Sequence, residues 1–581
     1  MDCERETTMQ YVMKTIVKWT SDCRPGLLAG LLAGLVLSVA PTGDLSAQEK
    51  ENRISYVISN ADGLLADVEY MVKDLAGRTK TWNELIKENI DLFLDGVNRE
   101  EPVRIDMMFD EKNGEFYRPF FPVSDLRDFR NNVDAFGITN KPRSRVLYTC
   151  TNAFDGFMLI HEDYGIFIPK DKLSLIDPDA PEIVDPIQPL LDAKYDAGVL
   201  IDHDAAGMEQ RRSSLAEVRN QVLAGIKKKS TESPEEFEYR KLLALNRILE
   251  FETLYVEIER LEAGWITDPA KGSGVGTLNI SGIEGTVLAE TFSKIPELKS
   301  RFHVVPPVKD FVASGDMLYP IDAPHQDRFT STIKAYQPIA DQKIDRKDDL
   351  NADQKKAAKE AVDKTVKILE KGITMGVFDG FIEMRKAEPG KSESLHEAVI
   401  GLRATSGREI DEVVKLLPKI RDSFKAKVDS ETVGDFHIHE IVLESNVPPM
   451  IDSLFGTPCH IFLATSENMV LFSLGEKSLP WLKETLELVN NSTEEKTPEL
   501  FLEFKGHVGP FAKALSARKP NQDLVKFRDA VIEAFSEKFT DDYIEMTDEY
   551  VDGTIKGTLN AEPGLLRLLG IMVANFAEEN L

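Results

Sequence analysis

The feature that most constrains the fold is a hydrophobic period that changes repeatedly between two and 3.6 residues. Apolar residues alternate at 103–109, which is typical of a half-buried strand. Elsewhere they follow a helical stripe, as at 234–263, where Ser233 offers an N-cap. Turn signals such as Asn113-Gly114 join neighbouring strands in antiparallel hairpins. The sequence therefore predicts an α+β fold in which antiparallel sheet packs against helices.

The order of these elements repeats loosely along the chain. LNISGIEGTVLAETF (278–292) is comparable with TIKGTLNAEPGLLRLL (554–569). We therefore expect two loosely repeated halves, with a long helical hairpin (206–228 and 234–263) in the first. The predicted organisation is a signal peptide at 1–47, a first α+β region at 48–176, a linker with the helical hairpin and closing strands at 177–305, a connecting segment at 306–350, and a second α+β half at 351–581.

The N-terminus resembles a secretory signal. Basic residues precede an apolar run from Leu27 to Val39, and Leu45-Ser46-Ala47 offers small residues for cleavage after Ala47. The run is shorter than the roughly 20 residues that span a bilayer, although an uncleaved anchor remains the alternative. We expect export to the periplasm, the cell envelope or the extracellular space, with no transmembrane segment in the mature chain. The true start, Met1 or a later methionine, is open.

Charge and cysteine content restrict the function classes. The chain has 99 acidic and 70 basic side chains, for a formal charge of −29. Such a surface repels phosphate backbones, so nucleic acid is not an expected partner. Of the four cysteines, only Cys150 and Cys459 lie beyond the predicted signal. A disulfide between them is possible after export, but their apolar surroundings favour two separate buried thiols.

The best metal-binding pattern is His437-x-His439. Residues i and i+2 of a strand project from one face, so both imidazoles could contact one ion. Asp435 would share that face, and His460 lies on a possible neighbouring strand. The alternative interpretation, two partly exposed histidines on a solvated strand, is favoured because nothing in the sequence fixes a third ligand.

No other motif supports catalysis or cofactor binding. The glycine-rich run 272–276 follows a helix rather than a strand and matches neither phosphate-binding pattern. It is interpreted as a flexible loop leading into an edge strand. Ser516-x-x-Lys519 lacks the companion motifs of the serine enzymes that begin with this pattern. The sequence predicts no cofactor and leans against an enzyme.

Three stretches together resemble a known group of proteins. They are FFPVSDLRDF (120–129), the segment 232–268 with LNISGIEGTVLAE (278–290), and FGTPCHIFLATSENMVLFSLGEKSLPWLKETLELV (455–489). They are similar to an uncharacterised family of large exported proteins from planctomycete-type bacteria. The resemblance implies an envelope location in a two-membrane cell and a non-catalytic role. It carries over no catalytic or ligand-binding residues.

The resulting hypothesis is an exported, non-catalytic cell-envelope protein that binds a protein, lipid or polymer partner. Two alternatives remain open. One is a metal-dependent hydrolase with its site around His437 and His439, assisted by Asp435. The other is a structural component of the envelope. The sequence predicts neither the identity of the partner nor the oligomeric state.

Overall fold

The computed structural model describes residues 53–580 apart from 111–113, 176–184, 389–394, 446, 493, 517–524 and 536–540. The predicted signal peptide and its cleavage site at Ala47 lie outside the described residues. Within the described ranges, no helix is both long and apolar enough to cross a membrane.

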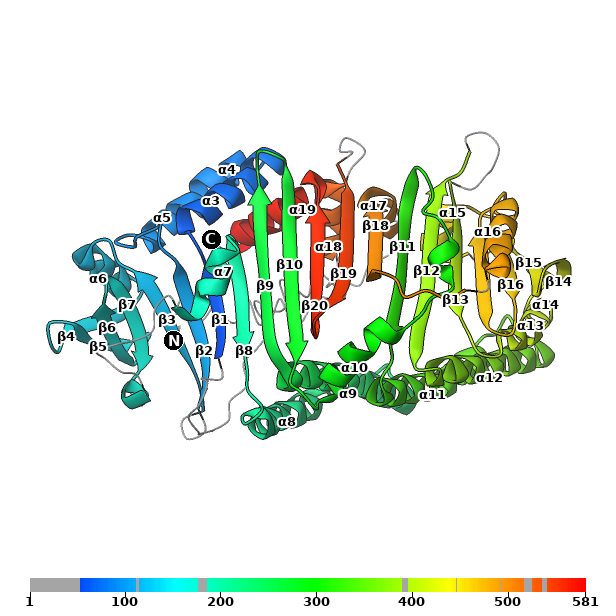
Figure 1. Cartoon of the computed structure of the whole chain (residues 1–581), viewed down its shortest axis with the longest axis horizontal. Coiled ribbons are helices and arrows are strands. Elements are labelled where there is room, and N and C mark those ends of the chain that lie inside the picture. The colour runs from blue at the N-terminus through cyan, green and yellow to red at the C-terminus, as the bar shows by residue number, and fades with distance from the viewer. Residues whose placement is uncertain are drawn as a thin grey trace.

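Twenty strands form one continuous antiparallel sheet across the described chain (Figure 1). The first ten are β1 (Arg53–Ile58), β2 (Val103–Asp110), β3 (Gly114–Pro122), β4 (Ile138–Pro142), β5 (Leu147–Asn152), β6 (Gly156–His161), β7 (Tyr164–Pro169), β8 (Ala197–Asp202), β9 (Ile258–Asp268) and β10 (Ser273–Gly282). The second ten are β11 (Phe311–Pro320), β12 (Val377–Lys386), β13 (His396–Arg403), β14 (Phe424–Val433), β15 (Phe436–Leu443), β16 (Cys459–Thr465), β17 (Met469–Leu474), β18 (Leu500–His507), β19 (Tyr543–Val551) and β20 (Thr554–Ala561). This sheet, packed with helices, confirms the predicted α+β class.

The two sets of ten strands have the same spatial order. Strand pairing places the first set as β4-β5-β6-β7-β3-β2-β1-β8-β9-β10. The second set is β14-β15-β16-β17-β13-β12-β11-β18-β19-β20. Each strand of the first set thus has a counterpart ten places later in the chain. The sets join at the centre, where β10 pairs antiparallel with β20.

Helices are inserted at matching points of the two sets. In the first set, α3 (Ala61–Glu69), η1 (Tyr70–Leu75), α4 (Thr79–Thr81), η2 (Trp82–Lys87) and α5 (Glu88–Phe93) follow β1, α6 (Leu126–Ala135) follows β3, α7 (Gln188–Asp192) follows β7, α8 (Met208–Gly225) and α9 (Pro234–Glu257) follow β8, and α10 (Val287–Lys294) follows β10. In the second set, α11 (Ala323–Asp345) and α12 (Ala352–Thr374) follow β11, α13 (Ile410–Val414) and α14 (Leu417–Ile420) follow β13, α16 (Leu479–Asn491) follows β17, α17 (Val508–Ser516) and α18 (Val525–Ala534) follow β18, and α19 (Pro563–Asn580) follows β20. Helix α15 (Pro449–Phe455) is an addition of the second set, because β5 and β6 are joined by a short turn.

Strand register extends the match to single residues. The hairpins β6–β7 and β16–β17 both close on a two-residue turn, so Ile160 corresponds to Thr465. From there the pairing can be followed through β7, β3 and β2 in the first set. In the second set it is followed through β17, β13 and β12. Both paths end at a buried pair of residues, and the two pairs correspond. These are Ser55 with Asp106 and Ser314 with Glu383. In both pairs the serine hydroxyl donates to the carboxylate, at 2.8 and 2.7 Å.

When the same register is followed to the central strands of the sheet, it aligns two identical tetrapeptides. Gly276–Asn279 in β10 and Gly557–Asn560 in β20 both read GTLN. Thr277 pairs with Thr558, its own counterpart, so an approximate two-fold axis passes through this pair. Identical residues at the positions related by the axis are the pattern that duplication of an ancestral half would leave.

The two faces of the sheet are covered unequally. Most helices pack on one face, where Ile280 and Ile555 of the central strands join a core with side chains of α9 and α10. On the opposite face, α7 packs near one end with Leu190 and α16 near the other with Leu486. Figure 1 shows α7 and α16 in front of the sheet, with α18 and α19 behind its centre. The front of β10, β20 and β19 carries half-buried or exposed polar side chains, an open face typical of antiparallel sheets.

Three expectations about the elements require correction. Helix α9 ends at Glu257 instead of reaching 263, because Ile258 turns to extended backbone and β9 then pairs with both β8 and β10. The glycine-rich run 272–276 lies mostly inside β10, a central strand rather than a flexible loop before an edge strand. The connecting segment 306–350 contains β11 and α11, so it belongs to the second set of strands.

The cysteines behave as the favoured interpretation expected. Cys150 and Cys459 are both buried and unbridged. Burial raises the pKa of the Cys150 thiol to about 11, so that thiol stays protonated and unreactive at neutral pH.

Candidate metal centre and polar face

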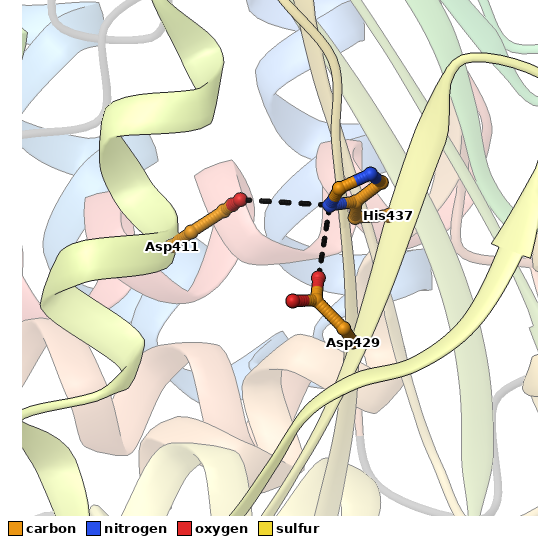
Figure 2. A group of neighbouring side chains, drawn as sticks. All are labelled: Asp411, Asp429 and His437. Atoms are coloured by element: carbon orange, nitrogen blue, oxygen red, sulfur yellow. Dashed lines mark ion pairs between the residues drawn. The ribbon is translucent and has the colours of Figure 1, made fainter.

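Three elements of the second set converge at one corner of the molecule. Helix α13 supplies Asp411, the edge strand β14 supplies Asp429, and β15 supplies His437 (Figure 2). Asp429 lies in a bulge of β14, where the pairing with β15 shifts between Lys427 and Glu431. Its φ of 52° is in the left-handed region, which the bulge uses to turn the carboxylate back toward β15.

The ligand-type atoms of these three residues lie close together. One oxygen of each carboxylate and the Nδ1 of His437 are all within 4.8 Å of one another. Nδ1 lies 2.9 Å from Asp429 Oδ1 and 3.9 Å from Asp411 Oδ2. The side chain of Asp411 is 13% exposed, that of Asp429 50% and that of His437 39%, so the group is open to water on one side.

His439 has a different role from the one the sequence suggested. Its side chain is fully buried, and the Asp429 backbone N–H donates to its Nδ1 at 3.1 Å. Nδ1 must therefore be the unprotonated nitrogen, which leaves Nε2–H to donate to Asp411 Oδ1 at 2.9 Å. Thr465 donates to the same oxygen at 2.6 Å. His439 thus orients the Asp411 carboxylate and has no nitrogen left for an ion.

The remaining predicted residues do not join the group. Asp435 lies in the turn before β15, where its backbone carbonyl accepts a hydrogen bond from Arg408. His460 pairs with Val442, on the opposite face of the sheet from His437. The two aspartates that do converge on His437 were missed, because only the packing of α13 and the bulge in β14 bring them near. The end of apolar alternation at Ser430, directly after Asp429, was the one local signal available.

A second arrangement of polar side chains lies on the open face at the two-fold axis. Thr277 and Asn279 of β10 have identical counterparts in Thr558 and Asn560 of β20. Asn279 pairs with Glu262 of β9, and Asn560 with Glu545 of β19, so the glutamates also correspond. We call these six residues the axial polar set: Glu262, Thr277, Asn279, Glu545, Thr558 and Asn560. All six side chains are half-buried, and Thr277 donates to the Tyr195 hydroxyl at 2.6 Å.

Comparison with known proteins gives no assignment. No protein-family model matches the chain, and no curated protein or solved structure is significantly similar to it.

Proposed function

We propose that the protein is an exported, non-catalytic cell-envelope protein that binds a hydroxyl-rich polymer across its open sheet face. The observation that carries the proposal is the axial polar set. The two halves have diverged at most corresponding positions, including Leu200 and Lys505 in the sheet itself. Identity at these three pairs of partly exposed polar positions is not required by core packing, so a shared ligand is its explanation.

The chemistry of the set favours a polymer with many hydroxyl groups. Carboxylates accept hydrogen bonds, amides both donate and accept, and the threonine hydroxyls do the same. The two copies of the set offer the same groups on both sides of the axis, so a ligand with many hydroxyl groups can contact both copies. A lipid would instead require a large apolar surface or cavity.

An aromatic cluster on the same face supports this choice. The rings of Phe311, His507 and Tyr543 lie 5.8 to 6.1 Å apart between centroids and are partly exposed. Tyr543 is two residues before Glu545 on β19, so the cluster borders the axial polar set. Such rings provide an apolar surface for the flat side of a sugar unit.

The geometry of the metal-type cluster argues against the hydrolase alternative. A hydrolytic site needs a group that can move a proton near the ion. His439 is the nearest candidate, but both of its ring nitrogens are engaged by Asp429 and Asp411.

Binding is tested by co-sedimentation of the full mature protein with purified peptidoglycan sacculi, chitin and cellulose. We expect retention on at least one of these. The double variant Asn279→Ala/Asn560→Ala should weaken retention about tenfold, the effect of about 1.4 kcal/mol of lost hydrogen bonding. The control Glu484→Gln/Glu487→Gln, on the exposed side of α16, should bind normally. No retention on any polymer, or equal retention of both variants, would reject the proposal; binding to vesicles or to a protein instead would redirect it.

The export part rests on the predicted signal at 1–47. Protein recovered from the envelope fraction should have, when denatured, the mass of a chain that begins at residue 48. The mass of a chain that still contains residues 27–39 would favour the anchored alternative.

A further inference from the structure

We infer that Asp411, Asp429 and His437 form a binding site for one divalent cation of the zinc or manganese type. Two carboxylate oxygens and one imidazole nitrogen are a ligand set that these ions accept in proteins. The residues come from α13, β14 and β15, so the ion would bridge three separate elements. This inference is independent of the polymer proposal, because the cluster lies at an end of the sheet and the axial polar set at its centre.

The first argument is that the two carboxylate oxygens of Asp411 have different contacts. Its Oδ1 accepts two hydrogen bonds, from His439 Nε2 and Thr465 Oγ1. Its Oδ2 is the atom that faces His437 Nδ1. Fixing one oxygen with buried donors while the other faces the remaining ligands is the second-layer arrangement that orients carboxylates at metal sites.

The second argument is the state of His437. Its Nδ1 is a buried atom that lies 2.9 Å from Asp429 Oδ1 but, among the described residues, makes no hydrogen bond of acceptable geometry. Two carboxylates beside one imidazole make the group net negative, and among the described residues the Nδ1 of that imidazole makes no hydrogen bond. A cation satisfies all three ligands after side-chain shifts of about 1 Å, which metal–ligand distances of roughly 2.0–2.2 Å require. Water can complete the coordination on the exposed side.

The third argument is the corresponding corner of the first half, which has diverged to a different chemistry. The ladder register that aligns Thr465 with Ile160 aligns His437 with Val146 and His439 with Tyr148. There Arg130 of α6 lies over the Tyr148 ring at 4.5 Å and donates to Asn140. The same architectural corner is thus held by a cation–π contact in one half and presents three ligand groups in the other.

The structural consequence of binding concerns the edge of the sheet. Within the part of the chain that the structure describes, strand β14 is the last strand of the sheet on its side and pairs only with β15. An ion held by Asp429 would fix the β14 bulge to α13 and β15. A fixed bulge also protects an exposed edge from pairing with other chains.

The site is tested by adding Zn²⁺ or Mn²⁺ to the metal-stripped full mature protein. We expect one ion per chain by native mass spectrometry and a rise in melting temperature that EDTA reverses. Asp429→Asn and His437→Gln should each lose the ion and the thermal shift. His460→Gln, a histidine on the opposite face, should retain both.

Folding of the variants is checked by their circular dichroism without metal, which should match that of the wild type because Asp429 and His437 are partly exposed. The asparagine variant of Asp429 keeps the size of the side chain, and the Asp429 backbone N–H that contacts His439 is unchanged. Absence of a bound ion in the wild type would overturn the inference. So would retention of the ion and the shift by both ligand variants.

Discussion

Several carboxyl groups, most of them buried or half-buried, have pKa values above their ordinary range. The pKa is raised to about 7 for Asp67 and Glu383, and to about 6 for Asp316, Asp379 and Asp548. Burial is the largest cause in each, and the neighbouring carboxylate of Asp196 adds to it at Asp67. A carboxyl that binds its proton more tightly when folded contributes stability below its unfolded pKa. That contribution is lost as the pH rises through the folded pKa.

Asp67 permits a direct test of this pH dependence. It lies on α3, and the proton of its carboxyl is held in a hydrogen bond with Asp196, whose charge also raises the pKa of Asp67. Asp67→Asn supplies a permanent donor in place of that proton. We expect the variant to match the wild type near pH 4 and to be more stable at pH 8, by on the order of 1–3 kcal/mol. Urea unfolding at pH 4 to 8 measures this, and the buried His203, which titrates in the opposite sense, cancels in the comparison. Equal stability of both proteins at pH 8 would contradict it.

The corresponding serine–carboxylate pairs should respond differently to removal of the hydroxyl. Asp106 also accepts hydrogen bonds from Arg104 and Arg118, whereas Glu383 has only the Val308 N–H besides Ser314 among its described hydrogen bonds. Ser314→Ala should therefore cost about 1–3 kcal/mol and raise the pKa of Glu383 further, whereas Ser55→Ala should cost about 1 kcal/mol. Urea unfolding at pH 8 compares them. A larger loss for Ser55→Ala would show that the arginines do not compensate.

At the scale of elements, local signals identified some boundaries well and failed where long-range pairing decided the outcome. Strand β2 begins at the predicted residue 103 and ends at 110, one residue beyond the predicted alternation, because apolar alternation sets its length. Helix α9 was predicted too long because Ile258 and Leu261 are spaced three residues apart, which suits a helix as well as a strand. Only the ladders to β8 and β10 select the strand, and no local pattern contains them.

The start of α9 gives a prediction at the same scale. Ser233 caps the helix as the sequence predicted, and with Glu236 it forms a reciprocal capping box in which both hydrogen bonds are present. Ser233→Ala should cost about 1 kcal/mol, since one helix N–H loses its partner. Ser233→Asp should retain most of the stability, because aspartate is an equally good cap. Thermal unfolding of the three proteins decides this, and equal destabilisation by both substitutions would show that the box is not the cause.

At the scale of the whole molecule, the sequence contains a correspondence between the two halves that local patterns revealed only in part. Comparison of 278–292 with 554–569 came close to the corresponding segments but did not align the GTLN tetrapeptides. Strand register supplies that alignment. It also moves the start of the second set of strands to Phe311, inside the segment 306–350 that was predicted to be a connection. The metal-type cluster shows the same limit, because Asp411 and Asp429 meet His437 only through tertiary packing.

The two halves are held together by more than the β10–β20 ladder. Helix α19 belongs to the second half and packs on η1 and η2 of the first half. There Ala574 joins a core with Val72 and Trp82. At Gly570 the approach is so close that a Cβ would lie 2.1 Å from the Met71 carbonyl oxygen. Any side chain at Gly570 must therefore push α19 away from the first half.

This interlocking predicts that the halves recognise each other as separate chains. Fragments 53–299 and 300–581, divided at the exposed Lys299, should co-purify as a 1:1 complex when expressed together. Without its partner, each fragment would have an unpaired central strand and uncovered helices. Gly570→Leu in the second fragment should abolish the complex, whereas Gly372→Ala, near the end of α12 with open space around it, should leave association intact. Size-exclusion chromatography with mass detection distinguishes these results. Two independent monomers from the wild-type fragments would show that the central ladder and α19 are too weak to join the halves without a covalent link.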